Sequence, residues 1–132
     1  MAYLFDSSAI YAITRARRTE LLIQSGTCSL ARYELCNILL TERHVRKRIS
    51  ESEQKYLLSK LVRALGFMRI MSIADYEQGI IDTAIELGLS FYDASYVHLA
   101  KKSGMVLVTE DAKLARKING HVHTATTAEL TR

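Results

Sequence analysis

Four acidic residues lie where apolar segments of this sequence give way to helical patterns: Asp6, Glu34, Asp93 and Asp111. Asp6 follows the apolar run of residues 3–5, and Asp111 comes shortly after the apolar run of residues 105–108. Short continuous apolar runs are typical of strands in a parallel sheet that is covered on both faces. Ligands of such sheets bind beyond the carboxyl ends of the strands. Asp6 and Asp111 are therefore expected where a binding site forms.

The other two acids fall in the first turns of predicted helices. Asp93 comes three residues after Ser90, which is the spacing of a capping box. Glu34 lies on the apolar stripe that contains Ala31 and Ile38, so its carboxylate is directed inward. A buried charge needs a partner or a metal ion. If the strands are parallel, all four acids can converge on one edge of the sheet.

Each acid taken singly has a simpler explanation, because Asp residues that cap helices far outnumber catalytic ones. The joint arrangement favours chemistry. Two carboxylates ~4 Å apart repel by ~4 kcal/mol at an effective dielectric near 20, so four of them need a cation. A site with oxygen ligands alone suits Mg²⁺ or Mn²⁺. The constellation indicates metal-assisted phosphodiester cleavage.

The elements that must position these acids alternate between strand and helix. The patterns predict strands at residues 3–5, 27–30, 67–73, 105–108 and 121–125, separated by helical segments. One of these helices is expected at residues 31–45, one begins at the capping box Ser50 to Glu53, and another is opened by Ala74-Asp75. The predicted fold is α/β, a central parallel sheet of about five strands with helices on both faces. With 132 residues, the chain is expected to form one domain, residues 1–132.

Basic residues exceed acidic ones, which gives a formal net charge of +4 and makes a polyanionic partner plausible. Two groups are predicted to contact the phosphates of such a partner: Arg43, Arg46, Lys47 and Arg48 in one, and Arg15, Arg17 and Arg18 in the other. A solvated helix end is the alternative explanation for the first group. Without an apolar run of ~20 residues or a signal-peptide pattern, a cytoplasmic protein with no membrane partner is expected.

Several segments together resemble the PIN-domain ribonucleases, in particular the VapC-type toxins. They are Leu4-Phe-Asp6-Ser-Ser, Ala-Arg-Tyr-Glu34-Leu, Phe91-Tyr-Asp93-Ala-Ser-Tyr-Val-His-Leu-Ala and Leu107-Val-Thr109-Glu-Asp111. The resemblance covers essentially the whole chain in the family's order. Its acid positions fall on Asp6, Glu34, Asp93 and Asp111, and its hydroxyl position falls on Thr109.

What the resemblance implies is an acidic Mg²⁺ or Mn²⁺ site and endonucleolytic cleavage of RNA. It also implies a homodimer and a cognate VapB-type antitoxin. Asp6, Glu34, Asp93 and Asp111 are then the metal ligands. Thr109 orients a ligand or a water from behind them. Tyr92 and Tyr96 are interpreted as packing residues, with stacking on RNA bases as the alternative.

Two other functions stay open. A non-catalytic module that binds RNA or protein would keep the acids as helix caps. A receiver-like signalling domain would need an Asp after the third strand and a Lys after the fifth, and neither Ile73 nor Ala125 meets this need.

Overall fold

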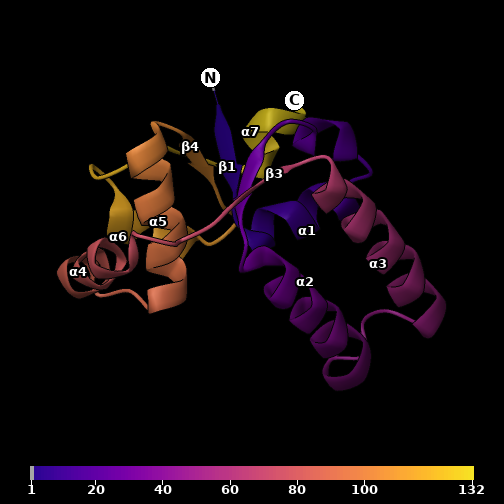
Figure 1. Ribbon diagram of the computed structural model, residues 1–132. Coiled ribbons are helices and arrows are strands. Elements are labelled where there is room, and N and C mark those ends of the chain that lie inside the picture. Colours follow the sequence, from indigo (N-terminus) through magenta and orange to yellow (C-terminus); the bar gives the residue numbers. More distant parts are fainter. Residues whose placement is uncertain (1) are drawn as a thin grey trace.

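Five short parallel strands form one sheet at the centre of the protein (Figure 1). The computed structural model describes residues 2–132. The strands are β1 Tyr3–Phe5, β2 Gly26–Cys28, β3 Arg69–Met71, β4 Val106–Val108 and β5 Thr124–Ala125, in the order β3-β2-β1-β4-β5. The predicted α/β fold with a parallel sheet of about five strands is confirmed.

Helices cover both faces of this sheet. The α-helices are α1 Ser7–Arg15, α2 Ala31–Leu40, α3 Glu51–Gly66, α4 Glu77–Leu87, α5 Phe91–Ser103, α6 Ala112–Ile118 and α7 Thr127–Thr131. Phe5 packs with the buried residues of α1, α2 and α3, whereas Leu4 packs with those of α5 and α6. Successive side chains of a strand point to opposite faces, so one short strand contributes to two cores.

The connections between elements correct several predictions. The capping box of Ser50 and Glu53 begins α3 as expected. Asp75 does not open α4, because its backbone is left-handed (φ 74°) and the helix begins after Tyr76. The last strand is shorter than predicted and leaves out His121. Helix α7 was not predicted, although a second capping box, formed by residues 126 and 129, begins it.

The sheet changes winding direction between β1 and β4. After β1 the chain adds β2 and β3 on one side, and then returns to place β4 on the other side of β1. The backbone N–H of Asp6 donates to the carbonyl of Val108 (3.1 Å), which joins the ends of the two strands. A crevice beyond the carboxyl ends of the strands at such a switch point is the expected ligand site.

Helices α2 and α3 extend away from the sheet as a two-helix arm (Figure 1). The π-helical turn η2 Thr41–Val45 continues α2 toward the tip of the arm. The arm carries the first basic group at its tip and Glu34 at its base. No helix in residues 2–132 combines the length and apolar character required to span a bilayer.

Candidate functional site

Asp6 is buried at the carboxyl end of β1 and caps α1. Its Oδ1 accepts a hydrogen bond from the backbone N–H of Ala9 (2.9 Å) and one from the hydroxyl of Ser8 (2.6 Å). The simple explanation of Asp6 as a helix cap is therefore correct in geometry. It does not use the whole carboxylate, because both bonds end on the same oxygen.

Ser8 and Thr109 join the two strand ends on which the acids sit. Their hydroxyl oxygens are 3.5 Å apart, and Ser8 Oγ also accepts from the backbone N–H of Glu110 (3.1 Å). Thr109 is only 2% exposed, and its Oγ1 accepts from the backbone N–H of Asp111 (3.1 Å). Thr109 thus holds the loop that carries Asp111. From sequence, Ser8 two residues after Asp6 was interpreted either as a helix cap or as support for a metal-bound water, and its contact with Thr109 was not predicted.

Glu34 is half-buried at the base of α2 and is held from two directions. The hydroxyl of Tyr96 donates to Glu34 Oε1 (2.6 Å), and the Ser7 side chain lies near enough to this carboxylate to lower its pKa, against the larger effect of burial. Tyr96 is 2% exposed, and burial together with the bond to Glu34 raises its pKa far above the ordinary range. The prediction that Tyr96 packs is correct but incomplete. Its position three residues after Asp93, on the same helix face, was the signal that it reaches the site.

Asp93 and Asp111 approach from α5 and α6. Ser90 Oγ accepts from the backbone N–H of Asp93 (3.1 Å), and Asp111 Oδ1 accepts from the backbone N–H of Leu114 (3.0 Å). Asp111 therefore caps α6, as its simpler explanation requires. In the described part of the chain, the expected capping box at the start of α5 is incomplete: Ser90 accepts from the backbone N–H of Asp93, but the return bond from the Ser90 backbone to the Asp93 side chain is not formed.

The carboxylates are near enough to perturb one another. Burial is the largest effect on the pKa of Asp6 and raises it. Hydrogen bonds from Ser8 and Thr109 lower this pKa in part, and the negative charge of Asp93 raises it slightly further. Burial, with smaller contributions from Asp6 and Asp93, raises the pKa of Glu34. The pKa of Asp93 is raised by burial and then by Asp111. Three carboxyl groups at one edge thus resist ionisation, chiefly because they are buried and to a lesser degree because they repel one another.

The residues fit a divalent cation by donor chemistry and charge. Four carboxylates with hydroxyl neighbours form an all-oxygen donor set, which suits Mg²⁺ or Mn²⁺. A bound cation would also stabilise the charged forms of three carboxyl groups whose pKa values are raised first by burial and then by their mutual repulsion. As the side chains stand in residues 2–132, however, no three His, Cys, Asp or Glu residues surround a common point closely enough to hold an ion. A shared ion would need side-chain rotation.

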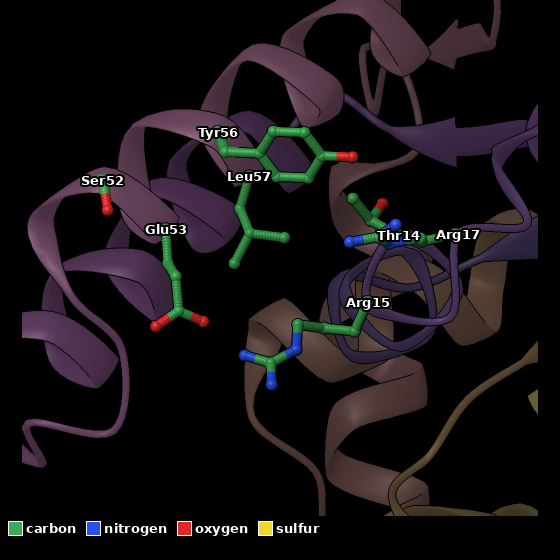
Figure 2. Close-up of a pocket in the computed structure, with 7 residues that line it drawn as sticks. All are labelled: Thr14, Arg15, Arg17, Ser52, Glu53, Tyr56 and Leu57. Carbon is green, nitrogen blue, oxygen red and sulfur yellow. The ribbon is translucent and has the colours of Figure 1, made fainter.

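The predicted RNA-binding residues do not line the acidic edge. Arg15 and Arg17 line a cavity of about 410 Å³ between α1 and α3, where Arg15 and Glu53 point toward one another (Figure 2). Arg18 pairs with Glu20.

The basic residues at the tip of the arm are partly paired. Arg43 contacts Glu51 (3.6 Å), and Arg46 and Arg48 contact Glu42 at 3.4 and 3.8 Å. A rise of ~1.5 Å per residue puts Arg46 roughly 18 Å along the arm from Glu34. These cations therefore lie well away from the acidic edge.

Comparison with known proteins identifies a family for the chain. A model of the PIN domain matches residues 3–119. The "Exonuclease VapC9" of Pyrobaculum aerophilum is 32% identical over 130 residues, which cover 94% of this chain and 91% of the relative. The "Ribonuclease VapC3" of the same organism is 32% identical over 126 residues, covering 89% of this chain and 95% of the relative.

Solved structures show the same fold. The crystal structure of PAE2754 from Pyrobaculum aerophilum matches with a TM-score of 0.80 and 28% identity, covering 98% of this chain and 92% of that chain. The DNA-bound VapBC of Salmonella typhimurium matches with a TM-score of 0.65 and 14% identity, covering 96% of this chain and 98% of that one. The second likeness concerns the fold alone.

Proposed function

Because this chain belongs to the PIN-domain family, with relatives of the VapC type, we propose that it is a Mg²⁺- or Mn²⁺-dependent endoribonuclease, the toxin of a VapBC-type pair. One observation carries the proposal: Asp6, Glu34 and Asp93 meet at the switch point of the sheet with raised pKa values. Family membership also removes the receiver-like alternative.

Each residue of the site has a role in this proposal. Asp6, Glu34, Asp93 and Asp111 bind the cation, which when bound supplies Lewis-acid activation of water and of the phosphodiester. Tyr96 and Ser8 donate hydrogen bonds that hold Glu34 and Asp6 in place. Loss of a hydrogen bond that supports a metal-binding carboxylate typically lowers metal affinity or activity by roughly 10- to 100-fold. Thr109 fixes the backbone at Asp111.

The mode of cleavage can be tested directly, because one relative is named an exonuclease and another a ribonuclease. We expect the protein to cut a circular single-stranded RNA in the presence of Mg²⁺ or Mn²⁺ and to lose this activity in a chelator. Gel analysis of circular and linear forms of one RNA gives the measurement. Degradation of the linear form alone, from an end, would show an exonuclease, and equal cleavage in the chelator would contradict the metal requirement.

We further propose that the arm tip contacts phosphates that flank the cleavage position. Replacing Arg46 and Arg48 by Ala should weaken RNA binding and flatten its salt dependence by roughly 0.7 log units per lost phosphate contact. Their surface pairs with Glu42 are weak enough to give way to phosphate. Filter binding across a salt series measures the slope.

The matched control removes two cations from the C-terminal end of α5, Lys101 and Lys102, which are exposed. Both double variants lose the same net charge. If the dependence of RNA affinity on salt changes equally in the two double variants, net charge accounts for the weaker binding and the arm makes no specific phosphate contact.

The homodimer, the cytoplasmic location and a VapB-type antitoxin partner stay predictions for this chain. Two solved structures of the same fold are DNA-bound VapBC of Salmonella typhimurium and VapBC2 of Rickettsia felis, and this supports the antitoxin proposal. Measurement of mass in solution tests the dimer.

A further inference from the structure

A cleft of about 270 Å³ opens between the first turns of α2 and α5. It is lined chiefly by apolar and aromatic side chains, among them Cys28, Leu30, Tyr33, Ile73, Phe91 and Tyr92. No charged side chain contributes to this lining in the described part of the chain. The cleft therefore differs in chemistry from the acidic edge, although the same two helices build both.

The cleft adjoins the acidic edge through consecutive residues. Tyr33 directly precedes Glu34 on α2, and Tyr92 directly precedes Asp93 on α5. Cys28 is buried at the floor of the cleft, and burial raises its pKa, with a smaller contribution from the charge of Glu34. Consecutive helical residues point to neighbouring sides of a helix, so a ligand in the cleft lies next to the turns of α2 and α5 that carry Glu34 and Asp93.

Two aromatic side chains at this cleft are more exposed than packing requires. Tyr33 is 78% exposed and Tyr92 is 59% exposed. The interpretation of Tyr92 as a packing residue is therefore wrong, because most of its surface faces solvent. Exposed aromatic faces beside a cleft are the usual platform for nucleic-acid bases, and a phenol adds a hydroxyl that can bond to a base edge.

We propose that this cleft is a base-binding subsite, in which Tyr33 and Tyr92 hold one unpaired nucleobase of the RNA beside the phosphate at the acidic edge. The inference rests on the proposed ribonuclease function. A volume of about 270 Å³ equals roughly nine waters at ~30 Å³ each, which is room for a single base and too little for a helix. With no cation in its lining, the cleft suits a neutral ring and not a phosphate.

Such a subsite gives the enzyme a contact that can distinguish bases. The phosphate contacts proposed for the arm carry no sequence information. A base held in a shaped cleft next to the reacting phosphate would make cleavage depend on the nucleotide at one position. It would also select single-stranded RNA, because a paired base cannot leave its stack without a cost of a few kcal/mol.

The test measures binding without cleavage, so that it does not depend on catalysis. In an Asp6→Asn background and a chelator, a single-stranded RNA with one 2-aminopurine is titrated against the protein, and its fluorescence reports base stacking. We expect Tyr92→Ala and Tyr33→Ala each to weaken binding by about 5- to 150-fold, the range for loss of one stacked base. Tyr92→Phe, which keeps the ring, should retain most of the binding.

Two controls make the result specific. Tyr56 on α3 is 46% exposed and lies outside the cleft, so Tyr56→Ala should leave the fluorescence change intact. An RNA that is abasic at the probed position should bind the parent and the Tyr92→Ala protein equally. Circular dichroism of each variant checks the fold, which the loss of exposed side chains should leave unchanged.

The outcomes separate the subsite from the proposed function. If both alanine variants bind the RNA and give the same 2-aminopurine fluorescence change as the parent protein, the subsite is refuted while the nuclease proposal stands. The subsite is likewise refuted if these variants lose only the binding of a protein partner. If the base-specific loss appears in a protein that cleaves no RNA under any metal condition, the subsite is supported and the enzymatic proposal fails.

Discussion

Asp6→Asn and Asp93→Asn should each reduce metal-dependent RNA cleavage by roughly 100-fold or more, the scale expected for loss of a preorganised electrostatic contact. An amide is a poor ligand for a hard divalent cation compared with a carboxylate. Asn retains the shape of Asp and caps a helix equally well, so the bond from Ala9 N–H to residue 6 should survive. Initial cleavage rates and Mg²⁺ titrations measure the effect.

Asp75 offers a matched control. It is exposed, distant from the acidic edge in the chain, and held in a left-handed conformation that Asn tolerates well. Asp75→Asn should therefore keep parental cleavage. Parental rates in both site variants, with unchanged affinity for Mg²⁺, would reject the acidic metal site and favour a binding module that keeps its acids as caps.

The same carboxylates should make the metal-free protein more stable in mild acid. The folded pKa values of Asp6, Glu34 and Asp93 are raised above those of the unfolded chain, first by burial. A raised carboxyl pKa adds stability as the pH falls from neutral through the folded value, and the gain is complete below the unfolded value. With a chelator present, Asp93→Asn should be the more stable protein at neutral pH and lose part of this advantage in acid. Urea unfolding at both pH values measures it.

Coexpression with a VapB-type antitoxin should suppress RNA cleavage almost completely, and replacement of one partner arginine should restore it. The carboxyl groups of the acidic edge have raised pKa values because they are buried near one another. A cation that binds there stabilises their charged forms. A guanidinium pairs with carboxylates through two parallel hydrogen bonds and can take the position of a metal ion. A partner arginine in that position blocks metal binding and substrate together.

The arm supplies the apolar contact that such a partner needs. A cavity of about 320 Å³ between α2 and α3 has an apolar side formed by Leu39, Leu40 and Leu58, and Leu40 is largely exposed; Arg43, His44 and Gln54 also line it. An amphipathic partner helix can place its apolar face there. Leu40→Ala, which removes the apolar side chain without adding a charge beside Arg43, should then weaken copurification of the antitoxin, whereas the RNA cleavage of the free toxin should not change. Suppression that survives both Asp93→Asn and the loss of every partner arginine would contradict this mechanism.

Sequence alone predicted the four candidate acids and the type of element that carries each of them. Hydrophobic periodicity and capping signals are local, so Asp6 after a strand, Glu34 on a helical stripe and the Ser50 box could all be predicted. The alternation of these elements then implied a parallel sheet, because parallel neighbours need crossover connections. The edge on which the acids meet followed from that single inference.

Tertiary structure decided how the acids are held, because these contacts join residues far apart in the chain. Ser8 and Thr109 are 101 residues apart, and they meet only because β4 pairs with β1. Tyr96 reaches Glu34 across 62 residues, since α5 packs beside β2 and the base of α2. Local propensity carries no information on such pairs, and the same limit explains the left-handed Asp75 and the short β5. Exposure of Tyr33 and Tyr92 at the cleft depends likewise on which neighbouring helices leave their rings uncovered.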